Sequence, residues 1–142
     1  MHVTFHVKED CALDTDDLPR IFSYIGGIAT KLGGILIAAG GVRDHVHLLV
    51  TVPKNISLSD YISKIKANSS RWLKTLGSRY RAFAWQDGYG GFSVSASKIE
   101  AVKSYIANQA EHHRKKTYAE EVEAFFEAYN TEKVAPLRGS NY

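Results

Sequence analysis

Two histidines separated by one apolar residue, His45-Val46-His47, are the first residues with chemical potential. On a β-strand, residues i and i+2 face the same side, so both imidazoles would point one way and Val46 the other. Two neutral imidazoles on one face form part of a site for a divalent metal ion such as Mg²⁺, Mn²⁺ or Zn²⁺, which needs further ligands. By itself the pair also fits two hydrogen-bonded histidines on the polar face of a strand.

A second group of interest is the pair Tyr105 and Gln109, four residues apart in a segment with helical periodicity. They lie one turn apart on the shoulder of an apolar stripe, where a side chain reaches a sheet edge or a partner while remaining partly wet. Taken singly, Tyr105 also fits a wider apolar face, and Gln109 a solvated helix position. The stripe consists of Ile99, Val102, Ile106 and Ala110.

Together these residues contain the groups that phosphoryl transfer requires. A metal ion would act as a Lewis acid on a phosphate oxygen and align the scissile bond. The Tyr105 phenol could attack phosphorus and hold it as a covalent phosphotyrosine, which divides the transfer into two steps. An amide ligand at Gln109 adds an oxygen without negative charge, a mixed set that Mg²⁺ accepts when substrate oxygens complete its shell.

Length and composition define the class of protein. The chain has 142 residues, 44% of them hydrophobic and 23% charged, which fits one globular domain and excludes disordered or collagen-like classes. The lone Cys11 cannot form an intrachain disulfide. No apolar run approaches the roughly 20 residues that span a bilayer, and the first residues do not form a signal peptide. We expect a cytoplasmic protein without a membrane partner, with one domain over residues 1–130 and a tail over 131–142.

The charge is unevenly distributed along the chain. The formal net charge is +3, but residues 1–60 carry −2, residues 61–116 carry +8 and residues 117–142 carry −3. A strongly basic central segment is typical of a protein with a polyanionic partner, although charge alone also fits an ordinary solvated surface.

The hydrophobic pattern predicts an α+β protein with the element order βαββαβα and an extra C-terminal helix. A four-stranded antiparallel sheet with helices on one face, the ferredoxin-like arrangement, is the simplest packing of that order. Capping-box spacings at Ser57/Asp60, Ser97/Glu100 and Thr117/Glu120 mark three helix starts. We expect strands near 2–8, 35–39, 45–52 and within 82–95, and helices near 14–33, 57–77, 97–113 and 117–129.

Four segments in this order make the sequence similar to a known family. They are GGVRDHVHLLV at 40–50, IKANSS at 65–70, WQDGYGGFSV at 85–94 and YIANQAEHH at 105–113. The sequence resembles the single-tyrosine HUH transposases, small enzymes that move bacterial insertion sequences as single-stranded DNA. The resemblance covers nearly the whole chain between residues 20 and 127, and the joint occurrence of the segments is far more specific than the histidine pair alone.

The resemblance implies a role for each of the candidate residues. His45, His47 and Gln109 would bind a divalent metal ion, Mg²⁺ or Mn²⁺, and Tyr105 would be the nucleophile. Attack by Tyr105 would give a 5′-phosphotyrosine and a free 3′-hydroxyl, which later rejoins the strands. Members of the family are homodimers with a shared sheet, whose tyrosine helix can dock on the partner's histidine pair, and they recognise DNA hairpins near the ends of the element.

The basic segment suits such a substrate. Aromatic residues in the same region, Tyr89 together with Trp85 and Phe92, could stack on unpaired bases or seal the core, and we favour the core for the last two. Asp44 precedes the histidines in the family pattern and would either orient one of them from behind or shape the turn. The side chains expected to follow the phosphates are Lys64, Arg71, Lys74, Arg79 and Arg81.

Two other classes of function fit parts of the sequence. A nucleotide hydrolase of the histidine-triad type needs a third histidine where Leu49 stands, so its nucleophile is missing. A non-catalytic module that only binds hairpins would have a similar sequence, because ferredoxin-like sheets with aromatic residues also recognise nucleic acids. Tight hairpin binding without cleavage under any divalent metal ion would favour that module.

Overall fold

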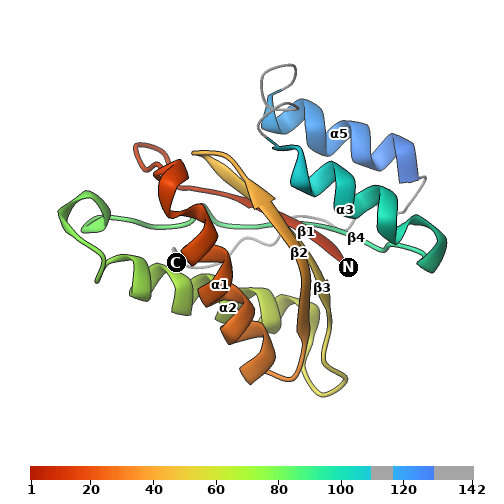
Figure 1. Ribbon diagram of the computed structural model, residues 1–142, viewed down its shortest axis with the longest axis horizontal. Helices are drawn as coiled ribbons and strands as arrows, with labels where there is room; N and C mark the ends of the chain where they lie inside the picture. Colours follow the sequence, from red (N-terminus) through yellow and green to blue (C-terminus); the bar gives the residue numbers. More distant parts are fainter. Residues whose placement is uncertain (110–116, 130–142) are drawn as a thin grey trace.

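The computed structural model describes residues 1–109 and 117–129 (Figure 1). The predicted tail over 131–142 lies outside this range. The described part of the predicted 1–130 domain contains four strands and four α-helices in the expected order. The strands are β1 (His2–His6), β2 (Ile35–Gly41), β3 (His45–Thr51) and β4 (Gly90–Phe92). The helices are α1 (Leu18–Lys31), α2 (Leu58–Leu73), α3 (Ile99–Ala107) and α5 (Tyr118–Tyr129).

The four strands form one antiparallel sheet in the order β2-β3-β1-β4. The two strands of the hairpin, β2 and β3, pair with each other, and β1 lies between β3 and β4. This order confirms the predicted α+β, ferredoxin-like class. None of the helices in the described residues is long and apolar enough to cross a membrane.

The alternation of side chains gives the sheet two different faces. One face presents Val3, Phe5, Val46, Leu48 and Val50, all at most 1% exposed, to the core formed with α1 and α2. The register pairs Thr4 with His47 and His6 with His45, so these side chains share the opposite face. We call the first the apolar face and the second the histidine face.

Helices cover both faces, which differs from the expected arrangement on one face. Figure 1 shows α1 and α2 on one side of the sheet, with α3 and α5 on the other. The physical reason is that Leu49 also belongs to the histidine face, where it packs against Val102 and Ile106 of α3. The apolar stripe predicted for α3 therefore finds its partner on the second face, because α1 and α2 already fill the first.

A glycine permits the close approach of α3 to the sheet. Gly40 on β2 is paired with His47, and a Cβ at Gly40 would overlap the backbone carbonyl oxygen of Ile106. Only a residue without a side chain fits there. Gly40 therefore lets the helix that carries Tyr105 lie directly over the strand next to His47.

The helix starts are mostly as expected. Asp60 N–H donates to Ser57 Oγ at 3.1 Å, and Thr117 and Glu120 form a reciprocal capping box. The box predicted at Ser97 is wrong, because a 3₁₀ turn over 96–98 precedes α3, and Ser97 Oγ instead lies 3.2 Å from Ser95 Oγ. The predicted continuation of this helix to residue 113 falls partly outside the described residues.

Candidate active site

The histidine pair lies in the middle of the histidine face. His45 and His47 are both fully buried, and their ring centroids are 5.2 Å apart. They point the same way because they are two residues apart on β3, as the sequence predicted. The two imidazoles therefore lie side by side on one face, where they could act together as nitrogen ligands of a metal ion.

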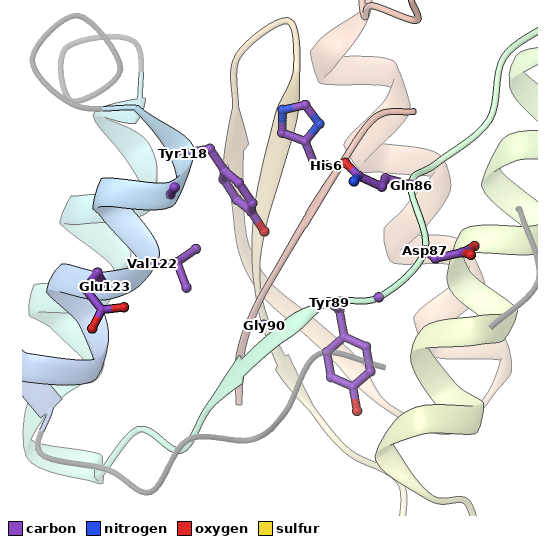
Figure 2. A pocket seen from close by; sticks show the side chains of 10 residues that line it. His6, Gln86, Asp87, Tyr89, Gly90, Tyr118, Val122 and Glu123 are labelled. Carbon is purple, nitrogen blue, oxygen red and sulfur yellow. The ribbon is translucent and has the colours of Figure 1, made fainter. Parts of the chain in front are cut away.

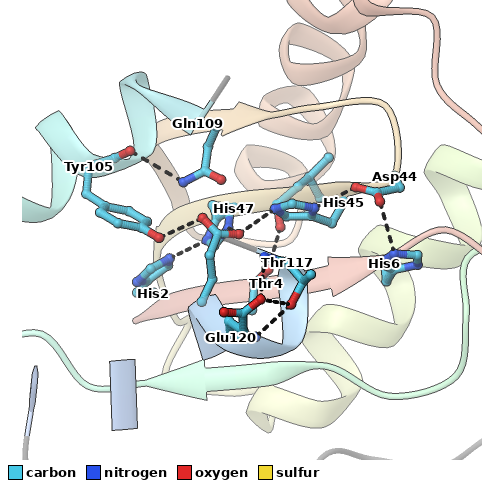
Figure 3. A network of polar contacts seen from close by, with 12 residues as sticks. His2, Thr4, His6, Asp44, His45, His47, Tyr105, Gln109, Thr117 and Glu120 are labelled. Carbon is cyan, nitrogen blue, oxygen red and sulfur yellow. Dashed lines mark hydrogen bonds and ion pairs between the residues drawn. The ribbon is translucent and has the colours of Figure 1, made fainter. Parts of the chain in front are cut away.

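A different neighbour orients each imidazole through its Nδ1 atom. Asp44 Oδ1 lies 2.8 Å from His45 Nδ1, and His2 Nε2 lies 2.8 Å from His47 Nδ1 (Figure 3). With both Nδ1 atoms engaged, the two Nε2 atoms face a common space, as in metal sites where an outer partner sets the ring orientation. The role expected for Asp44 thus has a matching contact, whereas sequence reasoning missed His2.

A carboxylate from the last helix enters that common space. Glu121 on α5 is fully buried, with Oε2 at 2.9 Å from His45 Nε2 and 3.7 Å from His47 Nε2. The candidate ligand atoms of these three residues all lie within 4.8 Å of one another, a spacing that can hold a metal ion. Sequence reasoning missed Glu121, because the only signal was an acidic residue in the first turn of a predicted helix.

Tyr105 reaches the same carboxylate from α3. Its hydroxyl donates a hydrogen bond to Glu121 Oε1 at 2.6 Å, and its ring centroid is 5.9 Å from that of His47. One carboxylate therefore contacts the histidine pair through one oxygen and the tyrosine hydroxyl through the other. The structure brings the predicted nucleophile to the predicted metal ligands within one chain.

Gln109 is the remaining predicted ligand. It is 1% exposed, its Nε2 donates to the backbone carbonyl of Tyr105 at 3.4 Å, and Figure 3 shows its amide directed toward the histidine pair. Its buried Oε1 has no hydrogen-bond partner among the described residues. An amide oxygen that is buried without a partner costs free energy, and a cation would satisfy it. The donor set of two imidazoles, one carboxylate and one amide oxygen fits a divalent metal ion.

Charge is balanced within this cluster. Burial lowers the pKa of His45, but hydrogen bonds to Glu121 and Asp44 outweigh burial and raise it overall. Burial likewise opposes ionisation of Glu121, yet hydrogen bonds from His45, His47 and Tyr105 hold the pKa of this carboxyl well below its usual range. The carboxylate is therefore ionised, which is the form that binds a metal ion.

The predicted phosphate-contacting residues lie elsewhere. Lys64 and Arg71 are on α2, which packs on the apolar face and not on the histidine face, Lys74 caps the end of that helix, and Arg79 and Arg81 follow in the next turn. All five, Lys64, Arg71, Lys74, Arg79 and Arg81, are exposed. Arg79 is already paired, with Asp14 at 2.8 Å and Asp17 at 2.9 Å.

The three aromatic residues considered for base stacking are buried. Trp85 and Phe92 are at most 1% exposed, as favoured from the sequence. Tyr89 is 6% exposed, packs in the main core and also lines a cavity beside α5.

Comparison with known proteins assigns the family. A model of the IS200-like transposases matches residues 1–109. The chain belongs to this family. The fold of this IS200-like transposase is also similar to a crystal structure of a candidate transposase from Deinococcus radiodurans R1, with a TM-score of 0.56 and 23% sequence identity over 76% of this chain and 88% of that chain. A search of curated proteins finds no match.

Proposed function

We propose that this transposase cleaves and rejoins single-stranded DNA at insertion-sequence ends through a 5′-phosphotyrosine on Tyr105. The observation that carries the proposal is the convergence of three groups on one carboxylate. The Tyr105 hydroxyl lies 2.6 Å from Glu121 Oε1, while His45 and His47 contact Glu121 Oε2. A nucleophile, an acceptor for its proton and a pair of metal-binding imidazoles are the parts that covalent phosphoryl transfer needs.

In the proposed cleavage step, a bond forms between the Tyr105 oxygen and phosphorus while the bond from phosphorus to the 3′-oxygen breaks. The phenolic proton passes to Glu121 Oε1, which already accepts the hydrogen bond from the hydroxyl. The 3′-oxygen takes up a proton and leaves as a free 3′-hydroxyl. Rejoining is the reverse reaction, with a 3′-hydroxyl as nucleophile and Tyr105 as leaving group. Each step exchanges one phosphate ester for another, so no nucleotide has to be hydrolysed.

The metal ion in this proposal is Mg²⁺ or Mn²⁺. His45 and His47 would hold it, with Glu121 Oε2 and the buried Gln109 Oε1 as the further protein ligands. When bound, the ion would polarise a phosphate oxygen and align the scissile bond. Asp44 and His2 would keep both imidazoles in the binding orientation through their Nδ1 atoms.

A covalent adduct is the direct test of the tyrosine. Protein is incubated with single-stranded element ends and Mg²⁺ or Mn²⁺, and the adduct is detected as a band of higher mass. Tyr105→Phe should abolish the adduct, whereas Tyr24→Phe should not, because Tyr24 stacks on Trp72 in the other layer and Phe retains that stacking. An active Tyr105→Phe variant overturns the proposal.

We propose that Tyr105 acts on DNA held at the histidine pair of its own chain, an arrangement that the contacts within one chain support. A mixing experiment tests this. Tyr105→Phe and His47→Ala are each inactive in the proposal, and a mixture should stay inactive if both residues must come from one chain. Recovery of cleavage in the mixture would mean that the tyrosine helix serves the partner's site.

The partners in the proposal are a hairpin-containing DNA strand and a second copy of the chain. Exposed cations along α2 support the first, since duplex phosphates are bound through such side chains. An apolar edge supports the second, because Ile35 and Ile37 on the edge strand β2 are 60% and 38% exposed. Ile35→Lys should lower the molar mass measured by light scattering to that of a monomer, and an unchanged mass contradicts a dimer through β2.

A further inference from the structure

A cavity of about 370 Å³ lies on the histidine face, between α5 and the segment 86–90 (Figure 2). We call it the Tyr118 cavity, because the ring of Tyr118 projects into it from α5. Its volume is at the lower end of the range of small-molecule sites, about 300–1,000 Å³, which suits one planar group better than a length of chain. The side chains that line it include His6, Gln86, Asp87, Tyr118, Val122 and Glu123.

The Tyr118 cavity and the candidate active site share a wall. The Tyr118 ring centroid is 4.8 Å from that of His45 and 5.2 Å from that of His6. His6 Nε2 in turn lies 3.6 Å from Asp44, which contacts His45. A DNA strand with its scissile phosphate at the histidine pair would therefore have a neighbouring nucleotide within reach of the cavity.

The lining has the chemistry of a base site and not of a phosphate site. An aromatic ring and the aliphatic Val122 offer a stacking surface. The charged side chains in the lining, Asp87 and Glu123, are acidic, and no lysine or arginine is among the described lining residues. Figure 2 shows the Asp87 carboxylate directed away from Tyr118 and the side-chain amide of Gln86 directed toward His6, where an amide can pair with a base edge.

A buried lysine makes one wall of the cavity rigid. Lys66 is 1% exposed, and its Nζ donates to the backbone carbonyls of Gln86 at 2.7 Å and Gly88 at 2.8 Å. Gly88 has a φ of +90°, which glycine adopts without strain. The backbone N–H of Gln86 also donates to His6 O at 2.8 Å. The segment is therefore held in shape before any ligand arrives, which reduces the entropic cost of binding.

We propose that the Tyr118 cavity binds one unpaired nucleobase of the DNA strand, from a nucleotide next to the phosphate that Tyr105 attacks. The inference rests on the proposed function for the placement of the strand. It adds that the protein itself reads one base beside the cleavage point.

The test moves an abasic site along a single-stranded element end, one nucleotide at a time, and measures equilibrium binding and covalent adduct formation. We expect an abasic site at one position flanking the scissile phosphate to weaken binding by roughly 5- to 100-fold, which is the loss expected when one stacked base is removed. In Val122→Trp, whose indole would fill the cavity, the intact strand should bind as weakly as the abasic one. Ala101→Trp, an exposed site on α3, is the matched control and should behave like the unmodified protein.

A second variant tests the cavity from the wall opposite α5, because Val122→Trp could also disturb the packing of that helix. Gln86→Ala removes an exposed side chain that makes no hydrogen bond among the described residues, so folding should be unaffected. We expect it to reduce the preference among bases at that one position and to leave the other positions unchanged. 2-Aminopurine placed there should lose fluorescence on binding, and Val122→Trp should remove that quenching.

The outcomes separate this inference from the proposed function. Adduct formation with no position-specific loss, or an unchanged profile in both Val122→Trp and Gln86→Ala, overturns the base site and leaves the proposed function intact. Absence of any adduct in the unmodified protein overturns the proposed function, while the binding measurements still decide whether the cavity takes a base.

Discussion

The two faces of the sheet are both buried, but each packs against its covering helices through a different kind of contact. On β3, Val46, Leu48 and Val50 pack against helices α1 and α2, where the contacts are apolar. Their neighbours His45 and His47 are just as buried, but they contact carboxylates, another histidine and the tyrosine helix. Adjacent residues of one strand thus belong to two layers, one of which is an apolar core while the other contains the proposed active site.

This difference between the two faces predicts how substitutions on each of them affect the protein. Apolar packing is nondirectional and depends on volume, so the apolar face should respond to truncation in stability. The histidine face depends on directed contacts to Asp44, His2 and Glu121, so it should respond in activity. The exposed cations of α2, Lys64 and Arg71, belong to the layer on the apolar face, so the proposed DNA contacts and the proposed cleavage site lie on different faces of the sheet.

The largest effect is expected on the histidine face. His47→Ala removes a proposed metal ligand, and cleavage should fall by on the order of 10³-fold or more, as when a central catalytic group is deleted. The free energy of unfolding should fall by about 1–3 kcal/mol, because His2 loses its buried hydrogen-bond partner. Single-turnover kinetics measure the cleavage rate, and calorimetry measures Mn²⁺ binding. Retained Mn²⁺ affinity would mean that the pair is structural.

The adjacent residue should give the opposite result. Leu48→Ala truncates a fully buried side chain of the apolar face and should lower the free energy of unfolding by about 2–5 kcal/mol in urea denaturation. Cleavage by the folded fraction at low temperature should stay near that of the unmodified protein. If Leu48→Ala lost cleavage while remaining folded, the two faces would not be independent.

Lys66 is the exception on the apolar side, a charged group on α2 that lies 5.4 Å from the centroid of the Phe5 ring. Burial lowers the pKa of Lys66 to about 8 from its usual 10.5. Between these values the unfolded chain holds a proton that the folded chain has released, so stability should rise with pH across this window, by up to about 3 kcal/mol.

The pH effect of Lys66 is isolated by comparison with Lys66→Met. Below about pH 8, both folded and unfolded chains carry the charge and the difference in free energy of unfolding between the proteins should be constant. From about pH 8 to 10.5 the unmodified protein should gain stability relative to the variant. A flat difference over this range would show that Lys66 titrates normally.

The smallest effect is expected from single cations outside the sheet. Arg71→Ala or Lys74→Ala should each weaken hairpin binding and reduce the slope of log affinity against log salt by about 0.7–0.9, one phosphate contact. Cleavage at saturating DNA should not change, because these side chains lie on the other layer. Lys54→Ala, an exposed cation outside the predicted set, is the control. Slopes that match the control would remove α2 from the DNA surface.

Local patterns in the sequence predicted a large part of the fold and pointed to most residues of the candidate site. The element order and sheet class follow from hydrophobic periodicity, which acts over a few residues. The histidine pair and the Tyr105–Gln109 pair follow from spacings of two and four residues. By contrast, the expected placement of helices on one face was wrong for α3 and α5, since the choice of face depends on which apolar surface remains uncovered.

Long-range packing decided what no local pattern could reveal. His2 meets His47 across 45 positions of sequence, and Glu121 meets the histidines from a helix whose pattern indicated only a cap and an acidic first turn. Lys66 looked like part of a basic segment, but it is buried under the segment 86–90. Each of these residues gains its role from a partner far away in the chain.

The sequence by itself determined which groups are available for chemistry, because the geometry of a strand or a helix places residues at short spacings on one side. Only the tertiary structure decided which of them meet. The sheet directs alternate side chains into separate layers, so the histidines face Tyr105, Gln109 and Glu121, while the cations of α2 remain on the other side. Because the basic residues and Tyr105 are close in sequence, we expected them in one region of the protein. In the structure, the cations of α2 and the Tyr105 helix lie on opposite faces of the sheet, since alternate side chains of a strand point to opposite sides.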